Sequence, residues 1–183
     1  MAKEEKKSIP FIVQLIILVV VMLFVRTYIL GTIYVKGVSM EPGFHHGDFV
    51  FISKMITHIG EYEQGDIVIC EIEEARGMER IIKRVIGVAG DEIDIFRDGD
   101  EGSFYVHVNG ERLDEPYIKD MIGSRGTIEY PYVVPEGCYF VMGDNRNSSM
   151  DSRDSSIGAI KQKDIMGKVF FRLYPFHDIS MIP

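Results

Sequence analysis

The stretch Gly65-Asp-Ile-Val-Ile-Cys-Glu-Ile72 places a turn dipeptide directly before a short run of mostly β-branched residues. The same arrangement recurs at Gly47-Asp48, which precedes the apolar run 49–53. Asn109-Gly110 follows the run 104–108, and this dipeptide after a strand-like run is a strong hairpin signal. Because no amphipathic helix or repeat is visible after residue 40, the sequence predicts a mainly β fold. Further strands are expected at 79–88, 137–142 and 167–174.

The N-terminal part of the chain has a different composition. Residues 11–30 are almost wholly apolar, and a helix of this length spans roughly 30 Å, the thickness of a bilayer core. The lysines within residues 1–10 place this end in the cytoplasm by the positive-inside tendency. A cleaved secretory signal is the alternative, but the apolar run is long and no small-residue cleavage site follows it. We therefore expect a single-pass protein of the cell membrane, with an anchor at 11–30 and an extracytoplasmic domain at 31–183.

The overall composition limits the possible functions. The chain has 183 residues, of which 46% are hydrophobic and 26% charged, which suffices for one core on one anchor. Its net charge of −8 makes the chain a poor candidate for nucleic-acid binding. The two cysteines, Cys70 and Cys138, make no disulfide framework, and we favour two separate buried thiols over a pair. Residues 91–127, rich in Asp, Gly and Glu, are expected to form a small inserted subdomain.

A serine and a lysine stand out after the anchor. Gly37-Val-Ser39-Met-Glu-Pro42 presents a serine in a turn, and Lys83 lies in the predicted strand 79–88. A serine hydroxyl is a weak nucleophile until a base takes its proton, and lysine is such a base only when it is neutral. If the strand is extended, Ile81, Lys83 and Val85 share one face, and apolar neighbours would lower the lysine pKa. The alternative is an edge-strand lysine that points to solvent.

A third segment, Met142-Gly-Asp-Asn-Arg-Asn-Ser-Ser-Met-Asp-Ser-Arg153, forms a dense polar loop after an apolar strand. By chemistry alone it could be a structural turn, a cation site or a shell that orients a catalytic base. The adjacent histidines His45-His46 lack the spacing of a helical zinc motif, so we expect exposed turn residues there and no metal.

In order and combination, these segments resemble type I signal peptidases, the membrane-bound serine endopeptidases that remove signal peptides from exported proteins. The resemblance implies a signal-peptidase-like antiparallel β-sheet domain with one N-terminal transmembrane helix. Lysine at position 83, rather than histidine, is typical of the prokaryotic Ser-Lys type, and Gly37 is similar to Gram-positive members. The motifs that carry the resemblance are Gly-Val-Ser39-Met-x-Pro, Ile-Lys83-Arg84-Val-Ile-Gly, Val-Asn-Gly110, Met-Gly-Asp-Asn-Arg146 and Gly167-Lys168.

The resemblance implies a role for each polar residue of the site. Ser39 is expected to be the nucleophile and Lys83 the general base, so that an acyl-enzyme forms and water hydrolyses it. The Ser149 hydroxyl would position the lysine amine. The expected oxyanion donor is the backbone N–H of Ser39, but Gly37 stands where some members carry a serine, so the second donor is open. No metal or cofactor is implied. The residues expected to hold the polar loop are Arg84, Asp144, Asp151 and Arg153.

Substrate selectivity is expected to come from apolar residues near the serine and lysine. In the family such positions line two shallow pockets for small side chains before the cut, and ordinary core packing is the alternative for each. Met40 and Phe44 are also expected to approach the bilayer. The implied partners are signal-peptide-bearing preproteins and the lipid bilayer, with no nucleic acid and no implied oligomer. The expected pocket residues are Ile33, Val35, Met40, Phe44 and Ile82.

Two other functions are compatible with parts of the sequence. One is a self-cleaving Ser-Lys peptidase of the SOS repressor type, which would be expected to carry a DNA-binding module where this chain has an anchor. The other is a catalytically silent, membrane-tethered scaffold of the same fold. Such a scaffold should have lost Ser39 or Lys83, and this chain retains both.

Overall fold

The structure, a computed structural model, describes residues 10–74, 77–97 and 103–183. The chain begins with helix α1 (Phe11–Phe24), which continues as a π-helical segment, Val25–Ile29. No residue of this helix is buried, although almost all of them are apolar. The helix is long and apolar enough to cross a membrane, which agrees with the expected anchor. It ends one residue earlier than expected because Leu30 begins the first strand.

The first sheet is antiparallel throughout and brings distant segments together. In spatial order its strands are β1 (Leu30–Tyr34), β2 (Phe49–Ser53), β11 (Ile165–Tyr174), β3 (Ile67–Glu74), β4 (Gly77–Gly87), β9 (Cys138–Met142) and β10 (Ile160–Lys161), with β12 (Ser180–Met181) on β11. Since β9 pairs with β4, the polar loop that follows β9 lies beside the strand that carries Lys83.

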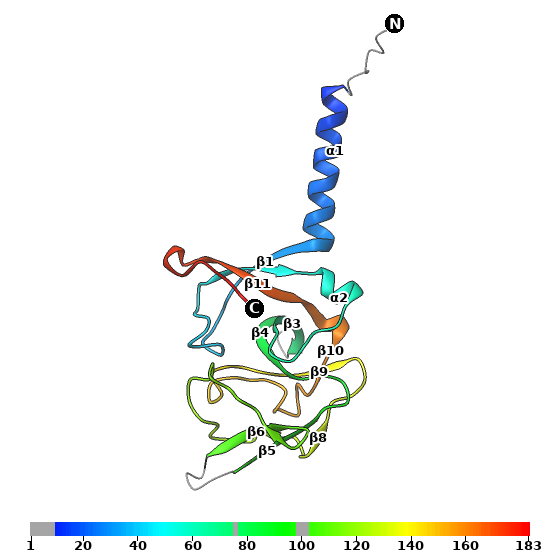
Figure 1. Ribbon diagram of the computed structural model, residues 1–183. Coiled ribbons are helices and arrows are strands. Elements are labelled where there is room, and N and C mark those ends of the chain that lie inside the picture. The colour runs from blue at the N-terminus through cyan, green and yellow to red at the C-terminus, as the bar shows by residue number, and fades with distance from the viewer. Residues whose placement is uncertain (1–9, 75–76, 98–102) are drawn as a thin grey trace, which may run out of the picture.

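A second antiparallel sheet lies at the end of the domain farthest from α1 (Figure 1). Its strands, in spatial order, are β7 (Glu111–Arg112), β6 (Phe104–Val108), β5 (Glu92–Arg97) and β8 (Tyr132–Val133). Three of these strands fall within the expected insertion 91–127, and β8 follows it. The short helices are α2 (Met55–Ile59) and the 3-10 turns Gln162–Asp164 and Phe176–Asp178.

The mainly β prediction is confirmed. Every expected strand is present, with ends shifted by at most two residues. Strand β5 was not expected, because its residues lie in a stretch rich in Asp and Gly that is typical of an excursion from the core. Its Ile93 and Ile95 alternate with polar residues and are fully buried, so the strand is held by one apolar face.

Strands β3 and β4 are covered on both faces, and this explains their continuous apolar runs. Ile67 and Ile69 enter one core cluster, whereas Val68 and Cys70 enter another on the opposite face. Cys138 belongs to a third cluster, so the two cysteines are buried, separate and free, as favoured from the sequence. Burial raises the pKa of the Cys70 thiol to about 12.

Candidate active site

Ser39 lies in the turn between β1 and β2, and hydrogen bonds from a distant loop fix this turn. The backbone N–H of Asn145 donates to the Ser39 carbonyl oxygen at 2.9 Å, and its side-chain amide donates to the Val38 oxygen at 3.1 Å. Gly37 has φ +83°, a left-handed conformation that favours glycine, and its N–H donates to His46 Nδ1 at 3.3 Å. The turn therefore has a defined conformation that depends on the loop after β9.

Lys83 reaches the serine from the middle of β4. Its Nζ lies 2.9 Å from Ser39 Oγ and 3.0 Å from the Ile82 carbonyl oxygen, both within hydrogen-bonding distance. The lysine is only 2% exposed, because Val68 on the paired strand β3 and other apolar residues cover it. The structure thus contradicts the solvent-facing alternative and brings together the two residues predicted to react.

The electrostatic environment of Lys83 favours its neutral form. Burial lowers the lysine pKa from its ordinary value of 10.5, and the charges of Asp151 and Asp144 only partly oppose this shift. None of the carboxylates that the structure describes forms an ion pair with Lys83. A neutral amine beside a serine hydroxyl can accept the hydroxyl proton.

The residues expected to hold the polar loop form two bidentate arginine–carboxylate pairs. Arg84 donates from Nε and Nη2 to both carboxylate oxygens of Asp144, at 2.8 and 2.7 Å. Arg153 makes the same arrangement with Asp151, at 2.8 and 2.9 Å. Burial alone would raise the pKa of Asp151, but the hydrogen bonds and charge of Arg153, together with the Ser149 side chain and the Gly143 N–H, outweigh burial and lower this pKa. Both carboxylates are therefore paired with arginine rather than with the lysine.

A third arginine–carboxylate pair was not predicted from the sequence. The Arg146 guanidinium is fully buried and binds both carboxylate oxygens of Glu115, a residue of the expected insertion. Arg146 also donates from Nε to the Gly143 carbonyl oxygen at 3.0 Å. Arg153 then donates to the Arg146 carbonyl oxygen at 2.6 Å, which links the pairs into one network. The loop is thus fastened both to the first sheet and to the segment between β7 and β8 of the second.

Ser149 lies next to the site but is not bound to the lysine. Its Oγ is buried and makes no hydrogen bond of regular geometry with the described residues, although its proximity to Asp151 contributes to the lowered pKa of that carboxyl. Gly143 separates Ser149 from Ser39, since a Cβ on Gly143 would clash with the Ser149 hydroxyl and the Ser39 carbonyl oxygen. In this state the second partner of Lys83 is the Ile82 carbonyl oxygen, not the Ser149 hydroxyl.

The expected pocket residues belong to one apolar cluster beside the serine and lysine. Val35, Met40, Phe44 and Ile82 are at most 5% exposed, and Ile33 packs against them while partly exposed. The expectation that Met40 and Phe44 approach the bilayer is wrong, because both side chains point into this cluster. They adjoin Ser39 and Lys83 only through the protein interior.

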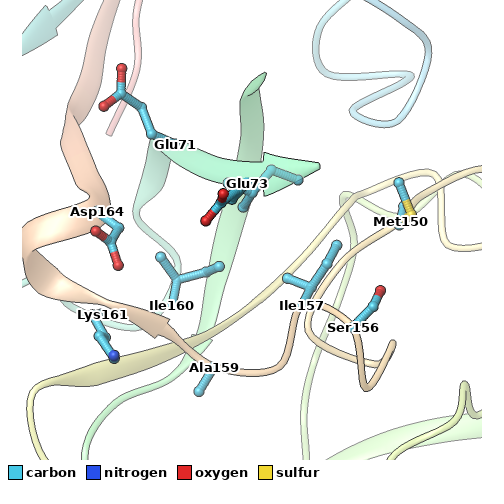
Figure 2. Close-up of a pocket in the computed structure, with 10 residues that line it drawn as sticks. Glu71, Glu73, Met150, Ser156, Ile157, Ala159, Ile160, Lys161 and Asp164 are labelled. Carbon is cyan, nitrogen blue, oxygen red and sulfur yellow. The ribbon is translucent and has the colours of Figure 1, made fainter. Parts of the chain in front are cut away.

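Figure 2 shows a pocket of about 640 Å³ elsewhere on the domain. Its lining includes the carboxylates of Glu71, Glu73 and Asp164 together with Ile157 and Ile160. None of the residues predicted for catalysis lines it. Across the described part of the chain, no group of His, Cys, Asp and Glu is arranged to hold a metal ion.

Comparison with known proteins relates the chain to one family. The family model described as signal peptidase, peptidase S26, matches residues 8–174. A signal peptidase I from Bacillus licheniformis is 36% identical over 184 residues, covering 96% of this chain and 94% of the relative. Signal peptidase I S from Bacillus subtilis is 35% identical and covers 96% of this chain and 95% of its own length. A solved signal peptidase I structure from Enterococcus faecalis is 30% identical, covers 60% of this chain and 97% of that chain, and has a TM-score of 0.44.

Proposed function

The chain belongs to the peptidase S26 family of signal peptidases, and from this premise we propose that it removes signal peptides from exported preproteins with Ser39 as nucleophile and Lys83 as general base. The observation that carries the proposal is the 2.9 Å separation of Lys83 Nζ and Ser39 Oγ. Burial of the lysine supports the role further, because a charged ammonium could not accept the serine proton.

The reaction follows from this geometry. Neutral Lys83 takes the proton of Ser39 while Oγ bonds to the scissile carbonyl carbon, and the lysine returns that proton to the departing amine. The ester formed on Ser39 is then hydrolysed by water that the same lysine deprotonates. The backbone N–H of Ser39 is the proposed oxyanion donor. The Gly37 N–H does not serve in this resting state, since it donates to His46 Nδ1.

The apolar cluster is the proposed source of selectivity. Its residues Val35 and Met40 flank the nucleophile in sequence, and Ile82 precedes the base. Ile33 is partly exposed, so it can contact a substrate residue directly. Packed walls of this kind admit Ala, Gly or Ser near the cut and exclude large side chains.

Membrane anchoring is part of the proposal. Helix α1 and its π-helical continuation would span the bilayer with the basic N-terminus in the cytoplasm and the β domain outside. Exposed apolar side chains on β1, on the 3-10 turn after β11 and on β12 support contact with lipid, since aromatic rings favour the membrane interface. They include Tyr34 (65% exposed), Phe176 (72%) and Met181 (70%).

Cleavage of a purified model preprotein in neutral-lipid vesicles tests the proposal. The wild-type chain should cut a preprotein with Ala at the first and third positions before the cut. It should fail when either Ala is replaced by Phe, because the walls are packed. Ser39→Ala should abolish cutting, whereas Ser148→Ala, which alters an exposed serine of the polar loop, should not. Wild-type turnover by Ser39→Ala would refute the assignment of the nucleophile.

A further inference from the structure

A groove of about 680 Å³ lies where the membrane helix meets the first sheet. In Figure 1 this is the junction at which α1 runs into β1. Volumes of about 300 to 1,000 Å³ are typical of ligand sites. The opposite wall includes Ile33, Ile52 and Met166 of the sheet. The wall on the helix side is apolar and is formed by Leu18, Val21, Met22 and Val25.

Three cations line the same groove, Arg26, Lys54 and Arg80. None of the lining residues is acidic, although the chain as a whole has a net charge of −8. Lys54 Nζ donates to the carbonyl oxygens of Arg26 and Thr27, each at 3.3 Å, so its ammonium is held at the end of the helix. Arg80 pairs with Glu71 outside the groove, yet 57% of its side chain stays exposed.

The cations remain available to a ligand. No carboxylate of the described chain forms an ion pair with Arg26 or Lys54. Arg26 lies near the end of the apolar helix, so the cations would stand at the level of lipid headgroups. Cations at that level attract anionic lipids. A purely apolar ligand would use the helix wall but would leave the charges without a function.

We propose that this groove binds an anionic phospholipid, with an acyl chain along the helix wall and the headgroup phosphate among Arg26, Lys54 and Arg80. The inference rests on the proposed membrane anchoring and is independent of the Ser-Lys chemistry. The apolar wall favours a lipid over free phosphate, and the cations favour an anionic lipid over a zwitterionic one.

Titration of the full chain in a neutral detergent tests the proposal. Short-chain phosphatidylglycerol and phosphatidylcholine with identical acyl chains are the probes, and isothermal titration calorimetry measures their Kd. We expect phosphatidylglycerol to bind at least tenfold more tightly. The double variant Arg26→Gln/Lys54→Gln should weaken phosphatidylglycerol binding by about 25-fold, since one cation at a membrane surface contributes about fivefold. Arg80→Gln alone should weaken it by about fivefold.

The matched control is Lys161→Gln/Lys163→Gln, which removes the same charge from two exposed cations outside the groove. An equal loss of binding in this control, or equal Kd values for the two lipids, would overturn the proposal. Inorganic phosphate that binds as tightly as phosphatidylglycerol would also overturn it, because the helix wall would then contribute nothing. The lipid assignment would likewise be wrong if a synthetic signal peptide, but not phosphatidylglycerol, bound with dependence on Arg26 and Lys54.

Two further measurements separate this inference from the proposed function. Ser39→Ala should bind phosphatidylglycerol like the wild type, so an error in the catalytic assignment leaves the lipid result unchanged. Flotation of the full chain with phosphatidylcholine vesicles tests anchoring alone. A chain that floats with these vesicles and shows no preference for phosphatidylglycerol in the titration retains its anchor but lacks the proposed lipid site.

Discussion

Lys83 and Arg84 are consecutive cations on β4, and their surroundings are opposite. Lys83 is almost fully buried and faces a hydroxyl and a carbonyl oxygen, whereas Arg84 makes a bidentate pair with Asp144. Since successive side chains of a strand point to opposite faces, one residue step separates the two environments. Burial without a carboxylate partner therefore lowers the pKa of Lys83, whereas Arg84 holds the loop after β9 through its bond to Asp144.

The largest expected effect concerns the unpaired lysine. Lys83→Met keeps the length and the apolar packing but removes the base, so preprotein cleavage should fall by at least about 10⁴-fold. The measurement is kcat/KM on one peptide substrate, with Lys36→Met, an exposed lysine, as the control. Residual turnover within tenfold of wild type would show that another group is the base.

The paired arginine should matter for stability instead. Asp144→Ala leaves the Arg84 guanidinium, whose side chain is 13% exposed, without its carboxylate. Breaking such a pair should lower the free energy of unfolding by about 3–5 kcal/mol. The control is Glu71→Ala, which breaks the exposed Arg80 pair on the same strand and should cost about 0–1 kcal/mol. Urea unfolding of the full chain in detergent measures both, and equal losses would contradict the comparison.

Unfolding measured over a range of pH tests the lowered pKa of Lys83. Because the folded-state pKa of Lys83 is lowered, the unfolded chain binds more protons between that pKa and about 10.5. The lysine therefore destabilises the fold fully below its lowered pKa, and this penalty fades as the pH rises toward 10.5. Each unit of lowering corresponds to about 1.4 kcal/mol. Lys83→Met should thus be more stable than wild type at neutral pH and equal to it above 10.5, as measured by urea unfolding at each pH.

The same lowered pKa predicts the pH profile of activity. In the proposed mechanism cleavage requires the neutral amine, so kcat/KM should rise with pH through the folded-state pKa of Lys83 and give an alkaline optimum. An acidic limb near pH 4, the ordinary range of a carboxyl group, would identify a carboxylate such as Asp151 as the base.

The smallest expected effect concerns Ser149. Its hydroxyl is buried without a regular hydrogen bond, so Ser149→Ala should change the free energy of unfolding by no more than about 1 kcal/mol. Its proposed role is to position the lysine amine once substrate is bound, although it does not bind the amine in the resting state. With that role, kcat should fall by about 10- to 100-fold and the acidic limb should shift. A fall in kcat with an unchanged limb would limit Ser149 to a packing role. The pH profile of kcat/KM for both proteins decides between these roles.

The strands could be predicted from sequence because turn dipeptides before apolar runs define them. The pairing of Ser39 with Lys83 followed instead from the resemblance to signal peptidases, since the apolar neighbours of Lys83 alone left a solvent-facing lysine open. The partner of Arg146 could not be predicted in this way. Glu115 lies 31 residues away in a polar segment, and the pairing depends on how that segment folds back.

The hydrogen bonds around Ser39 could not be predicted from the sequence pattern either. Asn145 binds the Val38 carbonyl oxygen across 107 residues, and only the pairing of β4 with β9 brings its loop there. Met40 and Phe44 illustrate a second limit, since an apolar residue in a turn suits a surface and a core equally. Met40 and Phe44 are buried in the core because the turn after β1 folds back over the sheet.

The junction between the helix and β1 has a consequence for where cleavage occurs. The helix passes into β1 without an intervening linker, and Lys54 fastens the two by its side chain and by a 2.8 Å bond from its N–H to the Ile29 carbonyl oxygen. In the proposed orientation, Ser39 therefore stands at a constant height above the membrane surface. The enzyme would select its cutting point partly by distance from the bilayer, so lengthening the apolar segment of a signal peptide should move the cut along the peptide while its depth stays the same.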